Sequence, residues 1–173
     1  NEGIDCDEEG EFTERSASIY DIVSNESMII IGQELDMPKL YDFAARNLRK
    51  NRTYIEPDGS ICTLNSKRQD ASLVAYPVKH YWAALFIAHQ KHDPFFAAMA
   101  EELLISSENC PNKTKISPGE VSEINIPISQ MMLNEKLKEP LEFTPISYDG
   151  EWFYKKAGVV RYRYGDTSLT LLK

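Results

Sequence analysis

The sequence predicts an α+β fold in which N-terminal and central helices pack on a C-terminal antiparallel sheet. Three observations carry this prediction. A chain of 173 residues has about the length of one domain. Up to about residue 107 the apolar side chains recur mainly at helical spacing, whereas from Leu141 onward they alternate with a period of two. Turn signals divide that last part into β-prone runs, so we expect a meander of about four strands.

The first fourteen residues are strongly acidic. They hold seven acids and no base, whereas the rest of the chain holds 20 acids and 19 bases. The net charge of −8 therefore falls to −1 when this stretch is left out. Chain termini are usually disordered unless something ties them down. We therefore expect residues 1–14 to form a flexible acidic tail and residues 15–173 to form a single α+β domain.

Two helices and a tight turn are expected after the acidic stretch. Ser16 or Ser18 can cap a first helix, although a Ser-Asn pair inside it could break it. Apolar spacing and a cluster of cations at its end predict a second helix over residues 36–51. Pro57-Asp58-Gly59 is a turn signal, because Pro presets φ and Gly accepts a positive φ. We therefore expect a small hairpin near residues 53–64.

Residues 71–107 form a central helical block. Pro77 and Pro94 interrupt it, and each proline should begin or kink a helix rather than lie inside one. Between them, residues 78–92 are apolar on nearly every side of a helical wheel, with Trp82 on the main stripe. We expect this helix to form the centre of the core.

Histidines gather at the end of that helix, where His89, His92 and Asp93 are the candidates for a metal site. A protein metal site needs three or four converging ligands. The sequence offers no HExxH motif, no CxxC motif and no second histidine cluster to complete one. We therefore expect no metal and no cofactor. His89 should lie in the core with one hydrogen bond, His92 should be exposed, and Asp93 should cap the next helix.

The cysteines bear on the compartment of the protein. The sequence contains three N-x-S/T triplets, at Asn25, Asn51 and Asn112. These triplets and a start at Asn1 instead of Met are compatible with export, so we expect an extracytoplasmic protein, periplasmic or secreted. In an exported chain Cys6 and Cys110 are expected to form a disulfide, because both lie in polar surroundings. A link between Cys62 and Cys110, or three free thiols, are the alternatives.

Arginines and tyrosines alternate in the run VVRYRY. Val160, Tyr162 and Tyr164 should share one face of a strand, and Arg161 and Arg163 the other. A nucleic-acid interface needs stacking aromatics and phosphate-binding cations on the same face. We therefore expect tyrosines packed on the helices, arginines in water, and no nucleic-acid partner.

Motifs of catalysis are absent from the sequence. It has no GxSxG elbow, no Gly-rich phosphate loop and no SxxK motif, and its longest apolar run, YWAALFIAH, is too short to span a membrane. A binding surface needs no diagnostic residues. We therefore expect a non-catalytic binding or inhibitory protein with a protein partner. One version neutralises a secreted toxin or enzyme, as an immunity protein does, by covering its site with an acidic or aromatic surface. The alternative is a small hydrolase centred on a Cys or His, with or without a metal.

Overall fold

The computed structural model describes residues 3–109 and 128–173, and it confirms the α+β class. The elements in chain order are α1 (Tyr20–Glu34), α2 (Leu40–Thr53), η1 (Pro77–His80), α3 (Tyr81–Lys91), α4 (Pro94–Asn109), α5 (Ile128–Leu133), η2 (Glu135–Lys138), β1 (Gly150–Tyr154), β2 (Val159–Tyr164) and β3 (Thr167–Leu172). The chain divides into two compact units, which we call the first unit (1–76 and 147–173) and the second unit (77–146). Such a division does not by itself establish separate domains, so the single domain over 15–173 stays a prediction.

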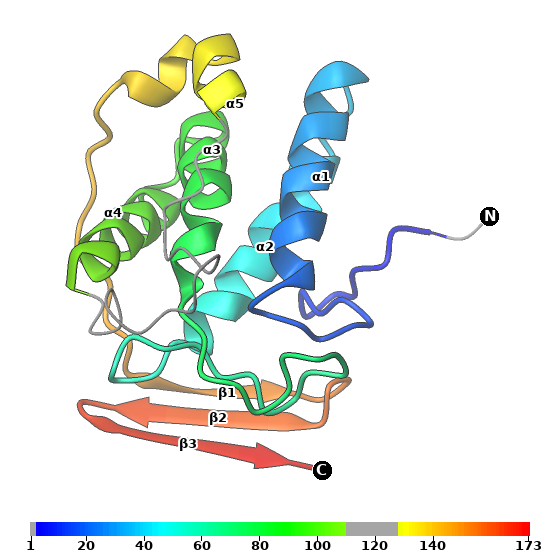
Figure 1. The fold of residues 1–173 in the computed structure, drawn as a ribbon, viewed down its shortest axis with the longest axis vertical. Helices are drawn as coiled ribbons and strands as arrows, with labels where there is room; N and C mark the ends of the chain where they lie inside the picture. The colour runs from blue at the N-terminus through cyan, green and yellow to red at the C-terminus, as the bar shows by residue number, and fades with distance from the viewer. Residues whose placement is uncertain (1–2, 110–127) are drawn as a thin grey trace, which may run out of the picture. The chain divides into compact units, whose positions relative to one another are not determined.

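Helices α1 and α2 of the first unit pack against each other (Figure 1). The N-cap residue of α1 is Ile19, with no side-chain cap hydrogen bond, so neither Ser16 nor Ser18 is the cap that the sequence predicted. The hydroxyl of Ser16 does accept a hydrogen bond from the backbone N–H of Tyr20, the first residue of α1, at 3.2 Å. The Ser-Asn pair does not break α1. The side chain of Asn25 donates to Asn47 on α2 at 2.8 Å, so it is not available to compete for the backbone of its own helix.

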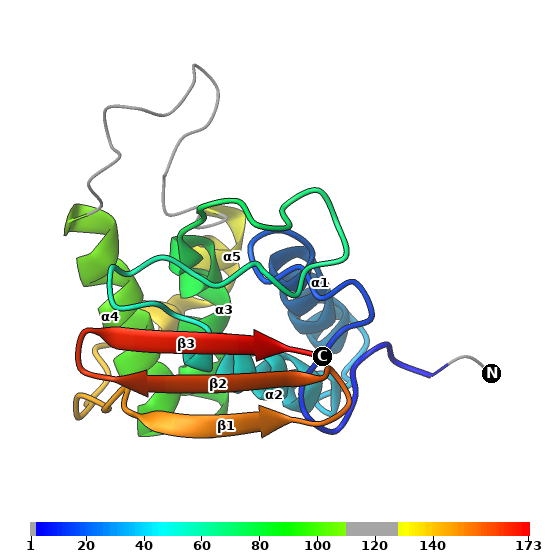
Figure 2. The same cartoon turned by 90° about the horizontal axis from the view of Figure 1, so that it is seen from below.

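The sheet of the first unit has the strand order β1-β2-β3, and both pairs are antiparallel (Figure 2). Its turns are tight, and Gly158 and Gly165 supply the positive φ values they require. The predicted meander had about four strands, and this number is wrong by one. No strand forms over residues 141–147. Pro145 lacks a backbone N–H, which removes a ladder hydrogen bond from that run.

The hairpin expected near residues 53–64 is present only as a tight reversal. Helix α2 continues through Thr53, which leaves too few residues for a first strand. Ile55 and Ile61 form an isolated antiparallel bridge around the turn. Gly59 has a φ of 81°, and the backbone N–H of Glu56 donates to the carbonyl of Ser60 at 2.7 Å. The turn chemistry of the sequence is thus confirmed, whereas the two strands are not.

The second unit is built on α3 and α4, which pack together. As predicted, Pro77 begins η1 and Pro94 begins α4. Helix α3 carries the centre of this core, because Trp82 and Phe86 are completely buried and their ring centroids lie 5.8 Å apart. From α4, the fully or almost fully buried side chains are Phe96, Ala98, Met99 and Leu103.

The described part of the acidic N-terminal stretch is packed against the rest of the first unit, contrary to the flexible tail expected from its charge. Glu11 is 6% exposed and its carboxylate lies 2.6 Å from the ammonium group of Lys50 on α2. Phe12 is 3% exposed. Composition indicated a solvated terminus, but one buried ion pair and one buried ring hold the segment in place.

Replacing Trp82 with alanine tests the core of the second unit. Trp82→Ala should lower the free energy of unfolding by about 3–5 kcal/mol, because it leaves a cavity where a completely buried indole packs. Met132, which is 72% exposed on α5, provides the control. Met132→Ala should change that free energy by less than about 0.5 kcal/mol in the same urea titration. A loss below about 1 kcal/mol for Trp82→Ala would show that α3 is not central.

Candidate functional site

Arg161, in the middle of β2, points into the first unit and is completely buried. Its guanidinium donates two hydrogen bonds to the carboxylate of Glu56, at 2.9 and 3.1 Å, and a third to the carbonyl of Thr53 at 3.2 Å. The same group also contacts the hydroxyl of Thr170 on β3. A bidentate pair of this kind fixes both position and orientation. It therefore determines which face of the sheet is turned inward.

The side chain of Arg163 also points into the first unit. It donates to the carbonyl of Ile55 at 2.7 Å, and its guanidinium carbon lies 4.3 Å from the ring centroid of Tyr148. Burial lowers the pKa of Arg163 from its ordinary value. The expectation of arginines in water and tyrosines on the helices is therefore wrong. The alternation itself is confirmed, but the two faces are exchanged.

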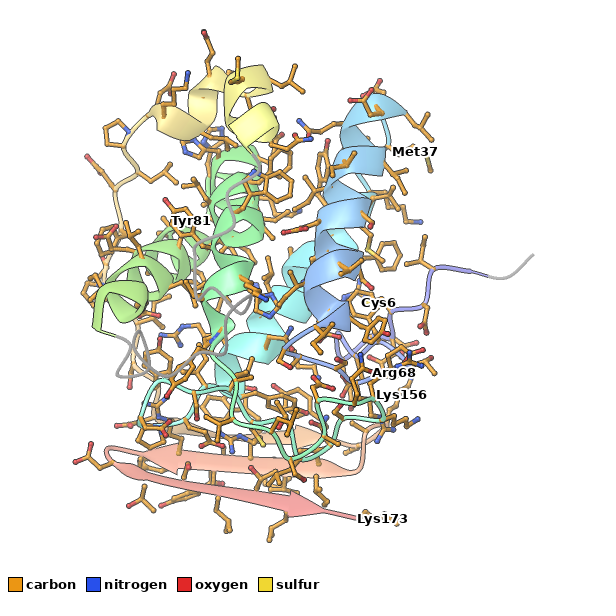
Figure 3. All side chains as sticks on the ribbon, viewed as in Figure 1. Cys6, Met37, Arg68, Tyr81, Lys156 and Lys173 are labelled. Carbon is orange, nitrogen blue, oxygen red and sulfur yellow. The ribbon has the colours of Figure 1, made fainter. Side chains whose placement is uncertain are left out.

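The outward face of the sheet is aromatic and aliphatic. The strand register places Tyr162 beside Leu169, and Val160 between Phe153 on β1 and Leu171 on β3. The large apolar side chains exposed on this face are Phe153 (62%), Leu171 (54%), Leu169 (51%), Tyr164 (47%) and Tyr162 (37%). Glu151 is the single charged residue of the three strands on this face. Side chains stand on both sides of the sheet in Figure 3. We call this surface the outer sheet face.

A second row of exposed apolar side chains follows α1. Ile19, Val23, Ile31 and Leu35 recur at multiples of four residues, and Leu35 is 65% exposed. At 3.6 residues per turn each step of four residues turns by about 40°, so these four side chains spread over an arc of about 160° around the helix. The outer sheet face spans three hydrogen-bonded strands and is the broader surface.

The histidine candidates do not form a metal site. Among the described residues, no group of three His, Cys, Asp or Glu side chains is placed to hold an ion. His89 is half-buried on α3, where desolvation lowers its pKa, and its Nε2 atom has no hydrogen-bond partner within the described part of the chain. The single hydrogen bond expected for it is thus missing at that atom. Asp93 accepts from the backbone N–H of Phe95 at 2.9 Å, as expected of a helix cap, and His92 is exposed.

The structure bears differently on the predictions for the cysteines and for the N-x-S/T triplets. Cys110 and Asn112 lie outside the described residues, so the predicted disulfide between Cys6 and Cys110 stays a prediction. Burial raises the pKa of Cys6 to about 11. Asn25 and Asn51 are buried at 0% and 1% exposure, so in the folded chain neither side chain is available to carry a glycan. These two triplets therefore give no support to export.

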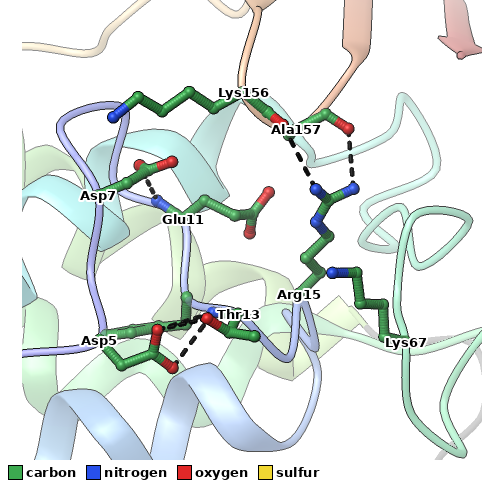
Figure 4. A pocket seen from close by; sticks show the side chains of 9 residues that line it. Asp5, Asp7, Glu11, Thr13, Arg15, Lys67, Lys156 and Ala157 are labelled. Atoms are coloured by element: carbon green, nitrogen blue, oxygen red, sulfur yellow. Dashed lines mark hydrogen bonds between the residues drawn. The ribbon is translucent and has the colours of Figure 1, made fainter. Parts of the chain in front are cut away.

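A small polar pocket of about 160 Å³ lies beside the acidic N-terminal stretch (Figure 4). Its lining residues are Asp5, Asp7, Glu11, Phe12, Thr13, Arg15, Lys67, Lys156 and Ala157. Most of the polar groups already have structural partners. The Asp7 carboxylate accepts from two backbone N–H groups at 2.8 and 2.9 Å, and Arg15 donates to the carbonyl of Ala157 at 2.8 Å. The residues of the pocket thus hold the N-terminal segment to the rest of the first unit.

A buried carboxylate organises the loop before α1. Asp70 is 1% exposed and accepts hydrogen bonds from the hydroxyls of Ser16, Ser18 and Ser66. Burial raises its pKa, but the three serine hydrogen bonds together outweigh burial and hold the pKa below its ordinary value. The ionised form of Asp70 is therefore the one that the fold stabilises.

Comparison with protein families, with curated proteins and with solved structures found no match to this chain. Within the described ranges, no helix combines the length and the apolar character required to cross a membrane. The outer sheet face was not found by sequence reasoning, although the uncharged run SLTLL in β3 could have indicated it.

The buried ion pair of the sheet can be compared with an exposed one. Arg161→Met should lower the free energy of unfolding by about 3–5 kcal/mol, because it removes one partner of a buried pair. Arg68 pairs with Glu14 at 2.9 Å, but these side chains are 40% and 41% exposed. Arg68→Met should leave the stability nearly unchanged in the same denaturant titration. Equal losses for the two variants would contradict the assigned burial.

The serine-bound carboxylate predicts a pH dependence of stability. Because the pKa of Asp70 is lowered in the folded state, its contribution is present above its ordinary pKa and is lost as the pH falls through the folded value. Asp70→Asn should cost about 1–3 kcal/mol at pH 7. Denaturant titrations at several pH values should show this difference shrinking below about pH 4. A difference that stays constant down to pH 2 would contradict the prediction.

Proposed function

We propose that the protein is a non-catalytic binding protein that docks a protein partner through the outer sheet face. The observation that carries this proposal is the group of five large apolar side chains, each at least 37% exposed, on three adjacent strands with one charged residue among them. Contiguous exposed apolar patches mark interaction sites on proteins. Aromatic residues are enriched at the centres of interfaces, where charged residues are depleted.

The aromatic surface is a better docking site than the acidic one. Several carboxylates of the N-terminal stretch are engaged within the first unit: Glu11 pairs with Lys50, Glu8 pairs with Lys156, and Asp7 binds backbone amides. Acids that are already paired attract a basic partner less strongly. The partner surface that fits the outer sheet face is therefore apolar and nearly uncharged.

Inhibition of a toxin or enzyme, in the manner of an immunity protein, is the version of this function that we favour. A rigid sheet that presents aromatic rings can cover the site of another protein without chemistry of its own. Export to an extracytoplasmic compartment, where such a target would be met, belongs to the same proposal. So does the absence of a nucleic-acid partner, because Arg161 and Arg163 are engaged inside the first unit.

The competing proposal is a small hydrolase with a cysteine nucleophile. A reactive cysteine requires a lowered pKa. Burial instead raises the pKa of Cys6 to about 11, and Cys62 is buried beside Thr170 at 3.5 Å. Neither described cysteine therefore supports that chemistry.

A pull-down with charge substitutions tests the proposal. The full chain is immobilised as the bait and incubated with a lysate of its source organism. The captured proteins are quantified by mass spectrometry. Leu169→Lys and Phe153→Lys place a charge in the centre of the outer sheet face and should weaken capture of the specific partner by at least about tenfold. Val23→Lys, at a position 55% exposed on α1, is the matched control and should leave capture unchanged.

The outcomes separate the explanations. Circular dichroism should show that all three variants stay folded, since the altered side chains are exposed. A partner that is lost with both sheet variants and retained with Val23→Lys supports the proposal. Capture that is insensitive to the sheet variants, or lost equally with the control, overturns it. If the specific partner is a second copy of the chain, sedimentation of the purified protein will show a dimer that Leu169→Lys dissociates.

A further inference from the structure

Four polar side chains lie buried between the two helices of the first unit. Asp21 and Asn25 lie one turn apart on α1, and Asn47 and Asn51 lie one turn apart on α2. Each of them is at most 1% exposed. We call these four side chains the α1–α2 polar cluster. Buried polar groups are normally hydrogen-bonded, so each atom of the cluster can be assigned a partner or found to lack one.

The hydrogen bonds fix how the amides are oriented. The Nδ2 atom of Asn47 lies 2.9 Å from the carbonyl oxygen of Gly10 and 2.9 Å from Oδ2 of Asp21, which both act as acceptors. Asn47 must therefore present its NH₂ group to them, and its Oδ1 is left as an acceptor. Asn25 and Asn51 lie 2.8 and 2.9 Å from that oxygen, so both must donate through Nδ2.

Three acceptor oxygens remain without a donor. They are Oδ1 of Asp21, Oδ1 of Asn25 and Oδ1 of Asn51. Flipping either amide would set its oxygen against the Asn47 oxygen and leave an NH₂ group without an acceptor, so no reorientation removes the deficit. Asn25 and Asn51 share one acceptor and Asn51 also donates to Asp21 at 3.0 Å, so the three side chains that carry these oxygens belong to one hydrogen-bonded network.

The negative charge of the cluster also lacks a counterion. Every hydrogen bond to the Asp21 carboxylate from the described residues comes from a neutral amide. The nearby cation Lys50 is paired with Glu11 at 2.6 Å. Asp21 lies in the first turn of α1, where the helix dipole offsets only part of a full charge. A buried charge without a partner is strongly unfavourable, so the folded cluster calls for a positive species.

We propose that the α1–α2 polar cluster binds an alkali-metal cation, held by the three unpartnered oxygens. Carboxylate and amide oxygens are the ligands that hard cations prefer. One carboxylate and two neutral amides carry a single negative charge, which a monovalent ion neutralises. Calcium sites usually combine several carboxylates among six to eight oxygens. A single water molecule would donate to two of the three oxygens and would leave the charge uncompensated.

The test is the thermal stability of the full chain in different salts at constant ionic strength. Replacing choline chloride with sodium or potassium chloride should raise the midpoint of unfolding by about 3 °C or more, because an ion that binds only the folded state stabilises it. Asp21→Asn removes the charge and keeps the shape, and it should abolish this rise. Asp70→Asn is the matched control, since it also neutralises a buried carboxylate but lies outside the cluster, and it should keep the rise.

A direct measurement on the native chain keeps the proposal testable if Asp21→Asn does not fold. The native chain should broaden the ²³Na resonance, and Asp70→Asn, which leaves the cluster intact, should broaden it equally. Equal midpoints for the native chain in choline and in the alkali salts would overturn the proposal and assign the oxygens to internal water. A native response to calcium alone, or an undiminished response in Asp21→Asn, would overturn it as well.

Discussion

The pair between Arg161 and Glu56 decides how the sheet of the first unit is oriented. A period of two gives a strand two faces, and one of them must carry both arginines of β2. The guanidinium of Arg161 finds a bidentate carboxylate, a backbone carbonyl and a hydroxyl inside the unit, so its burial is compensated. Once that face is inward, Tyr162 and Tyr164 must lie outward. The apolar outer sheet face is therefore a consequence of a polar contact on the opposite side.

The interior of the first unit holds many buried polar side chains, whereas the described core of the second unit is mainly apolar. Lys50 illustrates the difference, because its ammonium group is buried between the Glu11 carboxylate and the ring of Tyr54, 4.2 Å from the ring centroid. Burial raises the pKa of Glu11 in spite of this cation. Interactions of this kind contribute little net stability compared with apolar packing, but they are costly to break. They define one arrangement of the N-terminal segment, α2 and the sheet.

The sequence predicted the features that depend on neighbouring residues. Helix boundaries at Pro77 and Pro94, the turn at Pro57-Asp58-Gly59 and the alternation in β2 all follow from local chemistry, and the structure confirms them. The features that the sequence missed depend on distant partners. Glu56 lies 105 positions before Arg161, and Lys50 lies 39 positions after Glu11. Alternation predicts that the two faces of a strand differ. It does not predict which face is buried when both faces include apolar atoms.

The orientation of the sheet can be measured directly by side-chain footprinting of the native chain. The chain is labelled with a dicarbonyl reagent, which modifies exposed guanidinium groups, and with hydroxyl radicals, which modify exposed rings. Peptide mass spectrometry then identifies the modified side chains. With the sheet as described, Arg161 should resist modification, while Phe153 and Tyr164 should react as fast as exposed side chains elsewhere. Rapid modification of Arg161 together with protection of Tyr164 would show the opposite face inward and would contradict the account.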